Sequence, residues 1–493
     1  MDKTASFFSM ILLTTLLVQR CLAQIFVDTS APSGGFGTSV SPYNTISSAL
    51  SDATITNQGG TVFLISNQNL TDLQSSQIIH YPVEIMPEGS AVAFLFLTSG
   101  NFFQINSDLK FTNIHVQIGS LSASVTTLFS ISAGAQIILN SCIIEFLSEP
   151  LTLVYLVSSD LSSTVAFNDV KFQGFSISSL SSSFISLINI GQDGRLTASQ
   201  VTTNSVQLAQ GALMQMAAGA ESAIMDAVFD NVSSSSTAEM IYSQGSLNLT
   251  NVTFQNIWTS QVSILKVSNP DSLSVLSCTF TEVSYSNISV QGTMSSLILS
   301  DAANTQFNMS SISLSQVNTT GAAINITQSN QNNFLRAIST KNVLSNSSLL
   351  VSQSQSISLE NFSCFENNIY YAVPNQAAVY ALGGACLVLN NVLSSNLTQI
   401  NITSSTSQIE TPGFIFTSDD ATTMSLQSTL SYTGELSCTI TNSSFVNNSA
   451  IFGSDQRGGG AAFYIDSKIS VVINGSVFAG NKLDSDEYFG GPC

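Results

Sequence analysis

A short pattern of apolar and polar positions recurs along the chain: apolar, any, polar, apolar, any, apolar. Clear copies span Phe111–Val116, Phe167–Phe172 and Leu249–Phe254. Alternation of apolar and polar residues indicates a strand with one buried face. Here the alternation slips by one residue at the central polar position, which would turn every later side chain to the opposite face unless the backbone bends. The pattern therefore predicts a strand, a tight corner and a second strand.

The predicted corner residues recur at a nearly constant interval. From Asn113 the central polar position moves to Ser141, Asp169, Gln200, Asp226, Asn251 and Ser277, at intervals of 25 to 31 residues. Asn, Asp and Ser suit corners because their side chains bond to nearby main chain. The predicted structural corner ladder consists of Asn113, Asp169, Asp226, Asn251, Asn342, Asn361, Asn391 and Asn442.

A strand–corner–strand unit of this length describes one coil of a β-helix, in which stacking buries the apolar face of each coil. A β-sandwich also has frequent turns, but it needs no row of residue types at a long fixed period. We therefore predict an all-β fold, a right-handed parallel β-helix with a short N-terminal capping helix. Residues 24–60 would form the lead-in segment and helix, 61–359 the first coils, and 360–493 further coils.

The first 23 residues have the features of a secretory signal peptide. Lys3 precedes an apolar stretch, and Cys21-Leu22-Ala23 ends in a small residue, so we expect cleavage after Ala23. The apolar stretch is too short to span a bilayer, and no later stretch predicts a transmembrane span. We therefore expect an extracellular or cell-surface protein.

The N-terminal segment resembles that of many secreted pectin-lyase-like β-helix proteins. A glycine turn, Gly34–Thr38, precedes the helical pattern Pro42–Leu50. Residues 360–493 resemble the polymorphic outer-membrane protein repeats, which pair Phe-x-x-Asn with Gly-Gly-Ala. The matching residues, to which we assign structural roles, are Phe365, Asn368, Gly383, Gly384, Phe445, Asn448, Gly459, Gly460, Phe478 and Asn481.

This second resemblance implies a surface-displayed, adhesin-like β-helix. Each Phe is expected to point inward and each Asn to occupy a corner. The final Gly490-Gly491-Pro492 departs from the Gly-Gly-Ala motif, and Cys493 has no evident partner, so we expect the natural chain to continue.

The charge composition narrows the class of partner. The formal net charge is −19, and only 8% of residues are charged. Nucleic acid and anionic membranes are poor partners for such a chain. We expect an unknown protein or carbohydrate at the cell surface as the partner, and no cofactor.

Two further features concern modification and the cysteines. Sequons abound, and the candidate N-glycosylation sites include Asn69, Asn231, Asn287, Asn308 and Asn396. Cys142, Cys278 and Cys364 fall on inward positions, so we expect buried free thiols there.

Pectin-lyase-like proteins include lyases and glycosidases, so catalysis is the alternative function. Lys110, Lys171 and Arg195 could align from adjacent coils, as a lyase would require, and Asp169 and Asp226 share a predicted corner row. Asp419-Asp420 is an acidic pair without the Gly-His-Gly and Arg-x-Lys segments of polygalacturonases. His80 and His115 have no partner at zinc-ligand spacing. We therefore expect no catalytic site, no metal site and no enzyme activity.

Overall fold

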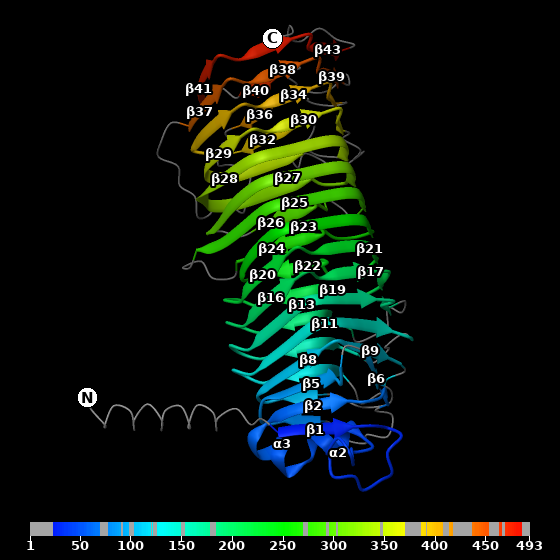
Figure 1. Ribbon diagram of the computed structural model, residues 1–493. Helices are drawn as coiled ribbons and strands as arrows, with labels where there is room; N and C mark the ends of the chain where they lie inside the picture. The colour runs from blue at the N-terminus through cyan, green and yellow to red at the C-terminus, as the bar shows by residue number, and fades with distance from the viewer. Residues whose placement is uncertain are drawn as a thin grey trace, which may run out of the picture.

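The structure is a computed structural model that describes residues 23–69, 77–89, 92–97, 103–119, 121, 126–148, 153–177, 184–269, 275–291, 295–301, 304–345, 349–369, 386–390, 392–407, 414–417, 436–452, 463–465 and 469–485. It is an elongated stack of coils in which neighbouring strands pair in parallel (Figure 1). The predicted right-handed parallel β-helix is confirmed. Each complete coil presents four faces, which we call A, B, C and D in chain order.

Face A is the longest ladder of the stack. The strands that lie wholly in face A are β1 (Ala23–Val27), β2 (Gly60–Leu64), β5 (Val83–Pro87), β8 (Asp108–Thr112), β16 (Arg195–Ser199), β20 (Glu221–Met225), β33 (Ser394–Thr398), β37 (Leu436–Thr441) and β41 (Ile469–Asn474). Longer strands, which extend over more than one face, each contribute one part. These parts are the first parts of β11 (Gln136–Phe146), β13 (Thr164–Gln173), β23 (Ser246–Thr259), β25 (Leu276–Val290) and β27 (Thr305–Thr319), a middle part of β28 (Ile324–Ser345) and the end of β29 (Leu350–Glu360).

Face B follows face A after a first corner. It contains the later parts of β11, β13, β23, β25, β27 and β28, together with β3 (Gln68–Asn69), β6 (Ala93–Leu97), β9 (Ile114–Ile118), β17 (Thr202–Asn204), the start of β21 (Val228–Ser234), β30 (Ser363–Phe365), β34 (Asn401–Thr403), β38 (Ser444–Val446) and β42 (Val477–Ala479).

Face C follows a second corner and is short. It contains the ends of the long strands and β14 (Ser176–Ile177), β18 (Val206–Leu208), β31 (Asn368–Ile369), β35 (Thr406–Ser407), β39 (Ser449–Phe452) and β43 (Lys482–Ser485).

Face D closes each coil and leads back to face A. It contains β4 (Gln77–Ile79), β7 (Phe103–Ile105), β10 (Thr127–Ile131), β12 (Tyr155–Ser159), β15 (Ser186–Ile190), β19 (Ala212–Met216), β22 (Ile241–Ser243), β24 (Leu265–Val267), β26 (Ile298–Ser300), the starts of β28 and β29, β32 (Leu387–Asn390), β36 (Phe414–Thr417) and β40 (Phe463–Ile465).

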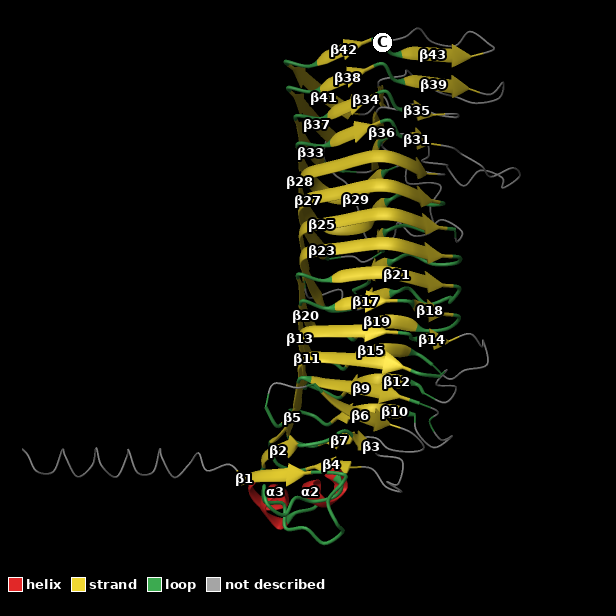
Figure 2. Cartoon of the chain, turned by 45° about the vertical axis from the view of Figure 1, so that its right-hand side comes forward, coloured by secondary structure: helices red, strands yellow, loops and turns green. Residues whose placement is uncertain are grey.

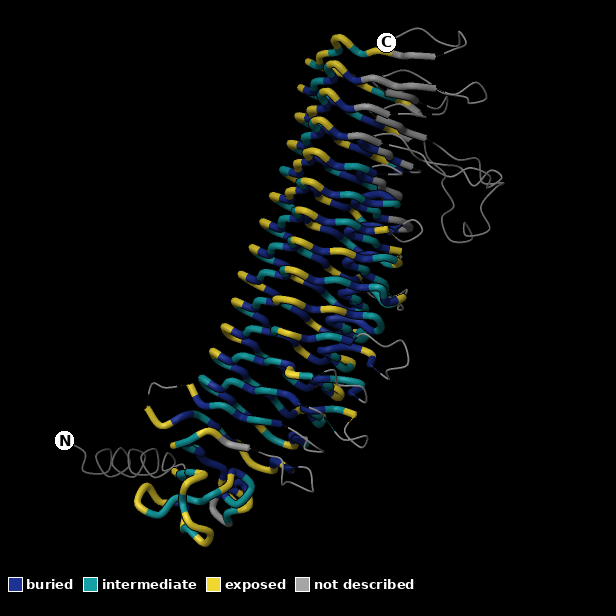
Figure 3. Tube along the Cα trace, turned by 90° about the vertical axis from the view of Figure 1, so that its right-hand side faces the viewer, coloured by how far each residue is buried: buried dark blue, intermediate teal, exposed yellow. Residues whose placement is uncertain are grey.

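The core is one continuous column of apolar side chains inside the stack. Between the corners of long strands such as β23 and β25, buried positions alternate with partly or fully exposed ones, as a strand with one buried face requires (Figure 3). Aromatic rings stack from coil to coil: the ring centroids of Phe229 and Phe254 are 5.0 Å apart, and those of Phe254 and Tyr285 are 4.9 Å apart. Because each coil covers the apolar face of the next, burial is shared along the whole stack.

Two short helices, α2 (Ile46–Leu50) and α3 (Ala53–Gln58), lie at the N-terminal base of the stack (Figure 2). The side chain of Thr45 accepts a hydrogen bond from the main-chain N–H of Ser48, which caps the start of α2. Strand β1 precedes these helices and pairs with β2. The segment expected to supply only a turn and a helix therefore also supplies a strand, which begins at Ala23.

Candidate functional site

Each predicted corner residue within the described ranges adopts a left-handed backbone. The positive φ angles of Asn113, Asp169, Asp226, Asn251, Asn361 and Asn442, all between 51° and 56°, place them at the first corner. Asn342 also has a positive φ, of 53°, but it lies at the second corner, between faces B and C. Asn391 lies outside the described residues. Asn tolerates this conformation better than most residues because its short amide bonds locally.

The sequence pattern did not distinguish the second corner from the first, and it counted Asn342 in a single corner row. Positive φ angles recur there at Ser205, Asn231, Asn256, Asn287 and Gln316. One predicted position was also wrong: Ser277 lies in face A, and the first corner of its coil is at Glu282, with a φ of 56°. Glu282 carries no side chain typical of a corner, because the corner selects a backbone conformation and not one residue type.

A groove lies on face A and is bordered by residues from four successive coils. Its volume is about 290 Å³, and its lining residues are Arg195, Leu196, Glu221, Ser222, Ala223, Ser246, Leu247, Asn248, Ser277 and Thr279. Arg195, Glu221 and Ser246 are register partners in one column, and Ala223, Asn248 and Thr279 are partners in the next. The parallel ladder thus brings together side chains that are far apart in the sequence.

Small side chains explain why the surface is hollow at this place. Ala223 and Ser246 stand between the long side chains of Arg195 and Glu221 and the amide of Asn248. Beneath them, Ser222 occupies an inward column position that is leucine in both neighbouring coils, at Leu196 and Leu247. The buried Ser222 hydroxyl has no hydrogen-bond partner within the described part of the chain.

The groove offers a guanidinium, a carboxylate, an amide and several hydroxyls. Both Arg195 and Glu221 are exposed. Together these groups can donate and accept several hydrogen bonds to a polar ligand. The sequence had singled out Arg195 only as a cation, without Glu221 or the groove.

Elsewhere on face A, cations also lie beside carboxylates. Lys110 Nζ is 2.8 Å from Glu84 Oε1, and Arg336 Nε is 3.4 Å from Glu360 Oε2. Lys110 and Arg195 lie in neighbouring columns of face A, whereas Lys171 lies on face B. The three cations considered for a lyase are therefore not aligned. Because the cations of face A stand beside carboxylates, the face is also close to electrically balanced.

A second polar cluster surrounds Glu145 on face B. Its carboxylate accepts hydrogen bonds from Gln117 Nε2 at 2.6 Å and Gln173 Nε2 at 3.1 Å. His115 Nε2 lies 2.9 Å from Glu145 Oε2, a contact that is an ion pair when the imidazole is protonated. The Gln117 hydrogen bond, followed by the charge of His115 and the amide of Gln173, holds the pKa of Glu145 below its ordinary value despite partial burial.

A third cluster lies on and beside face D around Lys266. Its ammonium is 3.1 Å from Asp301 Oδ2 and 3.6 Å from Glu239 Oε1. Burial acts to lower the pKa of Lys266, but the two carboxylates outweigh it and the net shift is upward. Lys266 therefore serves as a cation between two acids and is poorly suited to act as a base.

Asp169 and Asp226 share the first-corner row, as expected. However, Asn251 Nδ2 donates a 2.7 Å hydrogen bond to Asp226 Oδ1, which makes Asp226 part of an exposed ladder between coils. Asp419-Asp420 lies outside the described residues. Within the described ranges, no group of three His, Cys, Asp or Glu residues could hold a metal ion.

The Phe-x-x-Asn motifs lie where faces B and C meet. Phe445 and Phe478 stack with centroids 4.9 Å apart. Asn448 and Asn481 are not corner residues: the corners are Asn447 and Gly480, and Asn448 is fully buried. Phe365 does not share the inward column of Phe445. That column contains Cys364, because Cys364 pairs with Ile402 and Ile402 pairs with Phe445. Phe365 therefore points outward, where Lys341 lies over its ring, and Asn368 begins β31.

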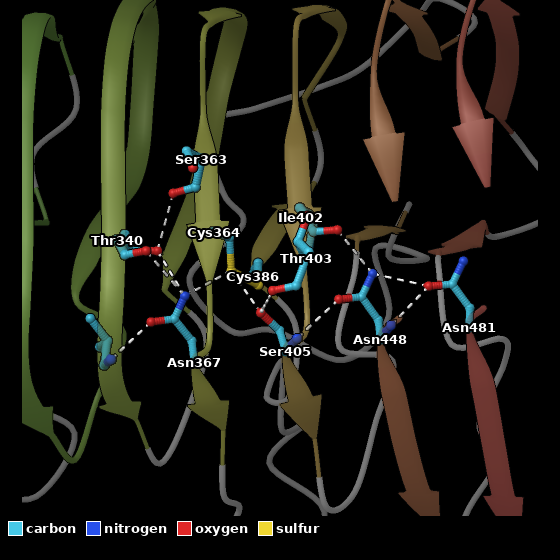
Figure 4. The surroundings of a disulfide bond; sticks show 11 residues. Thr340, Ser363, Cys364, Asn367, Cys386, Ile402, Thr403, Ser405, Asn448 and Asn481 are labelled. Carbon is cyan, nitrogen blue, oxygen red and sulfur yellow. Dashed lines mark hydrogen bonds between the residues drawn. A yellow bond between two sulfur atoms is a disulfide. The ribbon is translucent and has the colours of Figure 1, made fainter. Parts of the chain in front are cut away.

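Asn367 takes the place that the motif had assigned to Asn368. Its amide is buried and bonds to Thr340 and Cys364 (Figure 4). Residues Gly383, Gly384, Gly459 and Gly460 of the Gly-Gly-Ala motifs lie outside the described residues.

The cysteines differ from expectation at one position. Cys364 forms a disulfide with Cys386, so the expectation of a free thiol there was wrong (Figure 4). This bond joins face B to the start of face D within one coil, a proximity that sequence separation did not reveal. Cys142, Cys278 and Cys438 are free and buried, and burial raises their thiol pKa values to about 11, 12 and 11. Such thiols are poor nucleophiles.

The sequon asparagines occupy different environments. Asn308 and Asn396 point outward from face A and are exposed. Asn231 and Asn287 lie at second corners, where their Nδ2 atoms donate to Ser205 and Asn256. Asn69 lies in β3.

Comparison with known proteins gives a weak structural likeness. No protein family matches the chain, and no curated protein matches it in sequence. The chain is similar in structure to the crystal structure of a mutant of the periplasmic alginate epimerase AlgG, with 9% identity, 87% of each chain covered and a TM-score of 0.22. This neighbour is an enzyme, so the expectation that the present chain has no enzyme activity does not stand. A likeness this low identifies neither a reaction nor a substrate.

None of the helices in the described ranges has the length and apolar character needed to cross a membrane.

Proposed function

We propose that this chain is a secreted, surface-acting β-helix protein that binds an extended, electrically neutral polysaccharide at the groove on face A. The groove carries the proposal, since it combines a hollow of about 290 Å³ with a guanidinium, a carboxylate, an amide and hydroxyls. Ligand sites are commonly concave and present a few convergent polar groups. Sugar hydroxyls both donate and accept hydrogen bonds, so this mixed set suits them.

The β-helix architecture favours a linear ligand. Face A repeats the same outward positions at each coil, at spacings of about 4.8 Å. Arg195, Glu221 and Ser246 follow one another along the stack axis, not around the coil. A chain of similar units can therefore make similar contacts with successive coils.

Charge supports a neutral ligand over a polyanion. The chain has a net charge of −19, which repels polyanionic sugars at long range. On face A, Lys110 and Arg336 are paired with carboxylates, and Arg195 stands beside Glu221.

An extracellular location is part of the proposal. The signal-like N-terminus supports it, as does the Cys364–Cys386 disulfide, because such bonds persist mainly in oxidising compartments. Immunolocalisation on intact cells would test it.

Binding can be tested with a panel of neutral and uronate oligosaccharides by calorimetry. We expect a neutral glycan to bind, and Arg195→Ala or Thr279→Val to weaken it about tenfold, because each removes a hydrogen bond to the ligand. Lys171→Ala, a cation removed from face B, is the control and should bind normally. Binding that is unchanged in both groove variants would contradict the proposal.

A second candidate, which requires a different ligand, is proton abstraction from a uronate-containing chain, because its carboxyl group acidifies a neighbouring C–H that a neutral sugar lacks. It is favoured by the Arg195–Glu221 pairing. A carboxylate can accept a proton while a guanidinium stabilises developing negative charge. Glu221 is the single carboxylate among the lining residues, and hydrolysis by the usual glycosidase route needs two. Proton abstraction therefore fits the groove better than hydrolysis. Product analysis with wild type and Glu221→Gln would test it: turnover that persists in the variant would exclude Glu221 as the base.

A further inference from the structure

The outward column that lines the groove continues along face A to an exposed aromatic residue. Asn248 pairs with Thr279, Thr279 with Asn308, and Asn308 with Phe334. Phe334 is 49% exposed. Phe334 therefore lies in the same outward column as Asn248 and Thr279 of the groove, farther along the stack.

The separation is set by the spacing of the coils. Ala223, within the groove, is four coils from Phe334, which corresponds to about 19 Å along the stack. Thr279, at the far border of the groove, is two coils away, about 10 Å. A ligand that fills only the groove does not reach Phe334, whereas a longer linear chain passes over it.

The surroundings of Phe334 suit a sugar ring. Asn332 and Arg336, two residues away on either side in the same strand, also point outward and are exposed. Arg336 is paired with Glu360, and Asn332 Oδ1 accepts a 2.6 Å hydrogen bond from Ser356. An aromatic face flanked by polar groups can cover the apolar face of a sugar while its neighbours bond the hydroxyls.

Exposure alone would not single out Phe334, since isolated apolar side chains are normal on protein surfaces. Trp258 provides the contrast. It is 40% exposed and lies on face C between Ser233 and Ser289, away from the groove columns. Position in the groove column, more than aromatic character, distinguishes Phe334.

We propose that Phe334 is a second sugar-binding position for the chain held in the groove, which makes the protein selective for long glycans over short ones. This inference rests on the proposed function.

The experiment uses the whole protein freed of N-linked glycans and a length series of neutral β-linked glucan oligosaccharides, from the disaccharide upward, with binding measured by calorimetry. Wild type should bind long members more tightly than short ones. Phe334→Ala should weaken binding of long members roughly five- to tenfold, the size of one aromatic contact, and leave short members unchanged. The matched control Trp258→Ala should leave both unchanged.

The outcomes separate this inference from the proposed function. If Arg195→Ala weakens all lengths while Phe334→Ala changes none, the groove is supported and the Phe334 position is refuted. If no oligosaccharide binds, or if Arg195→Ala and Thr279→Val both leave binding unchanged, the proposed function and this inference both fail. An effect of Phe334→Ala seen only in protein that retains its glycans would also refute the inference, because Phe334 would then contact a glycan on Asn308.

Discussion

The inward position that follows the second corner is apolar in the central coils and polar in the C-terminal coils. In the centre it forms a column of β-branched residues: Val206, Val232, Ile257, Ile288, Val317 and Val343. Beyond Val343 the same position is occupied by Asn367, Ser405, Asn448 and Asn481. The change occurs within one strand ladder, without interruption of the parallel pairing.

The two columns hold neighbouring coils together by different means. The apolar column is stabilised by burial. In the polar column each asparagine Oδ1 accepts the main-chain N–H of the coil before it: Val343 N to Asn367 at 2.8 Å, Ser405 N to Asn448 and Asn448 N to Asn481 at 3.1 Å. Side-chain hydrogen bonds can thus hold neighbouring coils of a β-helix together where the inward residues are polar, provided that every buried polar group has a hydrogen-bond partner.

The largest expected effect comes from placing a polar residue in the apolar column. Ile257→Asn removes a buried side chain and buries an amide between Val232 and Ile288, so we expect a loss of about 4 kcal/mol of unfolding free energy. Chemical denaturation monitored by circular dichroism would measure it. A loss below about 1 kcal/mol would contradict this expectation, because it would show that apolar and polar residues in this column contribute equally to the unfolding free energy.

The disulfide adds a covalent link near the change from apolar to polar. The Cys364→Ala/Cys386→Ala double variant should lose about 3 kcal/mol, because the bond closes a loop with a sequence separation of 22. Reductant should destabilise wild type to the same extent and leave the double variant unchanged, as monitored by thermal melting. A similar response of both proteins would contradict this role.

The polar column should be sensitive to loss of its hydrogen bonds. Asn448→Val leaves the Ser405 N–H and the Ile402 carbonyl without their side-chain partner, and we expect a loss of about 2–3 kcal/mol. Hydrogen exchange of the C-terminal coils would report it locally. Asn447→Gly, at the adjacent exposed corner, is the matched control and should change stability by only a few tenths of a kcal/mol, because Gly also adopts a positive φ.

The smallest effect concerns the outer ladder at Glu145, and it depends on pH. The pKa of Glu145 is lower in the folded state than its ordinary value of 4.5. Its stabilising contribution is therefore present above that value and is lost as the pH falls through the folded-state pKa. Glu145→Gln should reduce stability at neutral pH. It should also make the melting temperature fall less steeply as the pH is lowered through the acidic range. Thermal melting across acidic pH, with Gln173→Ala as a control that removes one of the donors, would measure this; an unchanged steepness across that range would contradict it.

Much of the fold could be predicted because one local rule repeats. The slip at Asn113, Asp169 and Asn251 reflects a left-handed backbone position that Asn and Asp tolerate. The same rule failed at Glu282 and Ala337, which adopt a positive φ without a residue type that signals it. There the neighbouring coils determine the backbone.

The candidate site was harder to predict. Arg195 was noticed as a cation, but Glu221 and Thr279 carry no motif, and the groove exists only because the ladder register places them beside Ala223. The disulfide was missed for the same reason, since Cys364 and Cys386 meet across the interior of a coil.

The sequence by itself determined that this chain forms stacked coils, because alternation and corner residues act locally and repeat. Only the tertiary structure decided which side chains share a column, because one residue of register or one inserted loop shifts every later neighbour. The groove, its line to Phe334, the inner asparagine column and the disulfide all depend on that register.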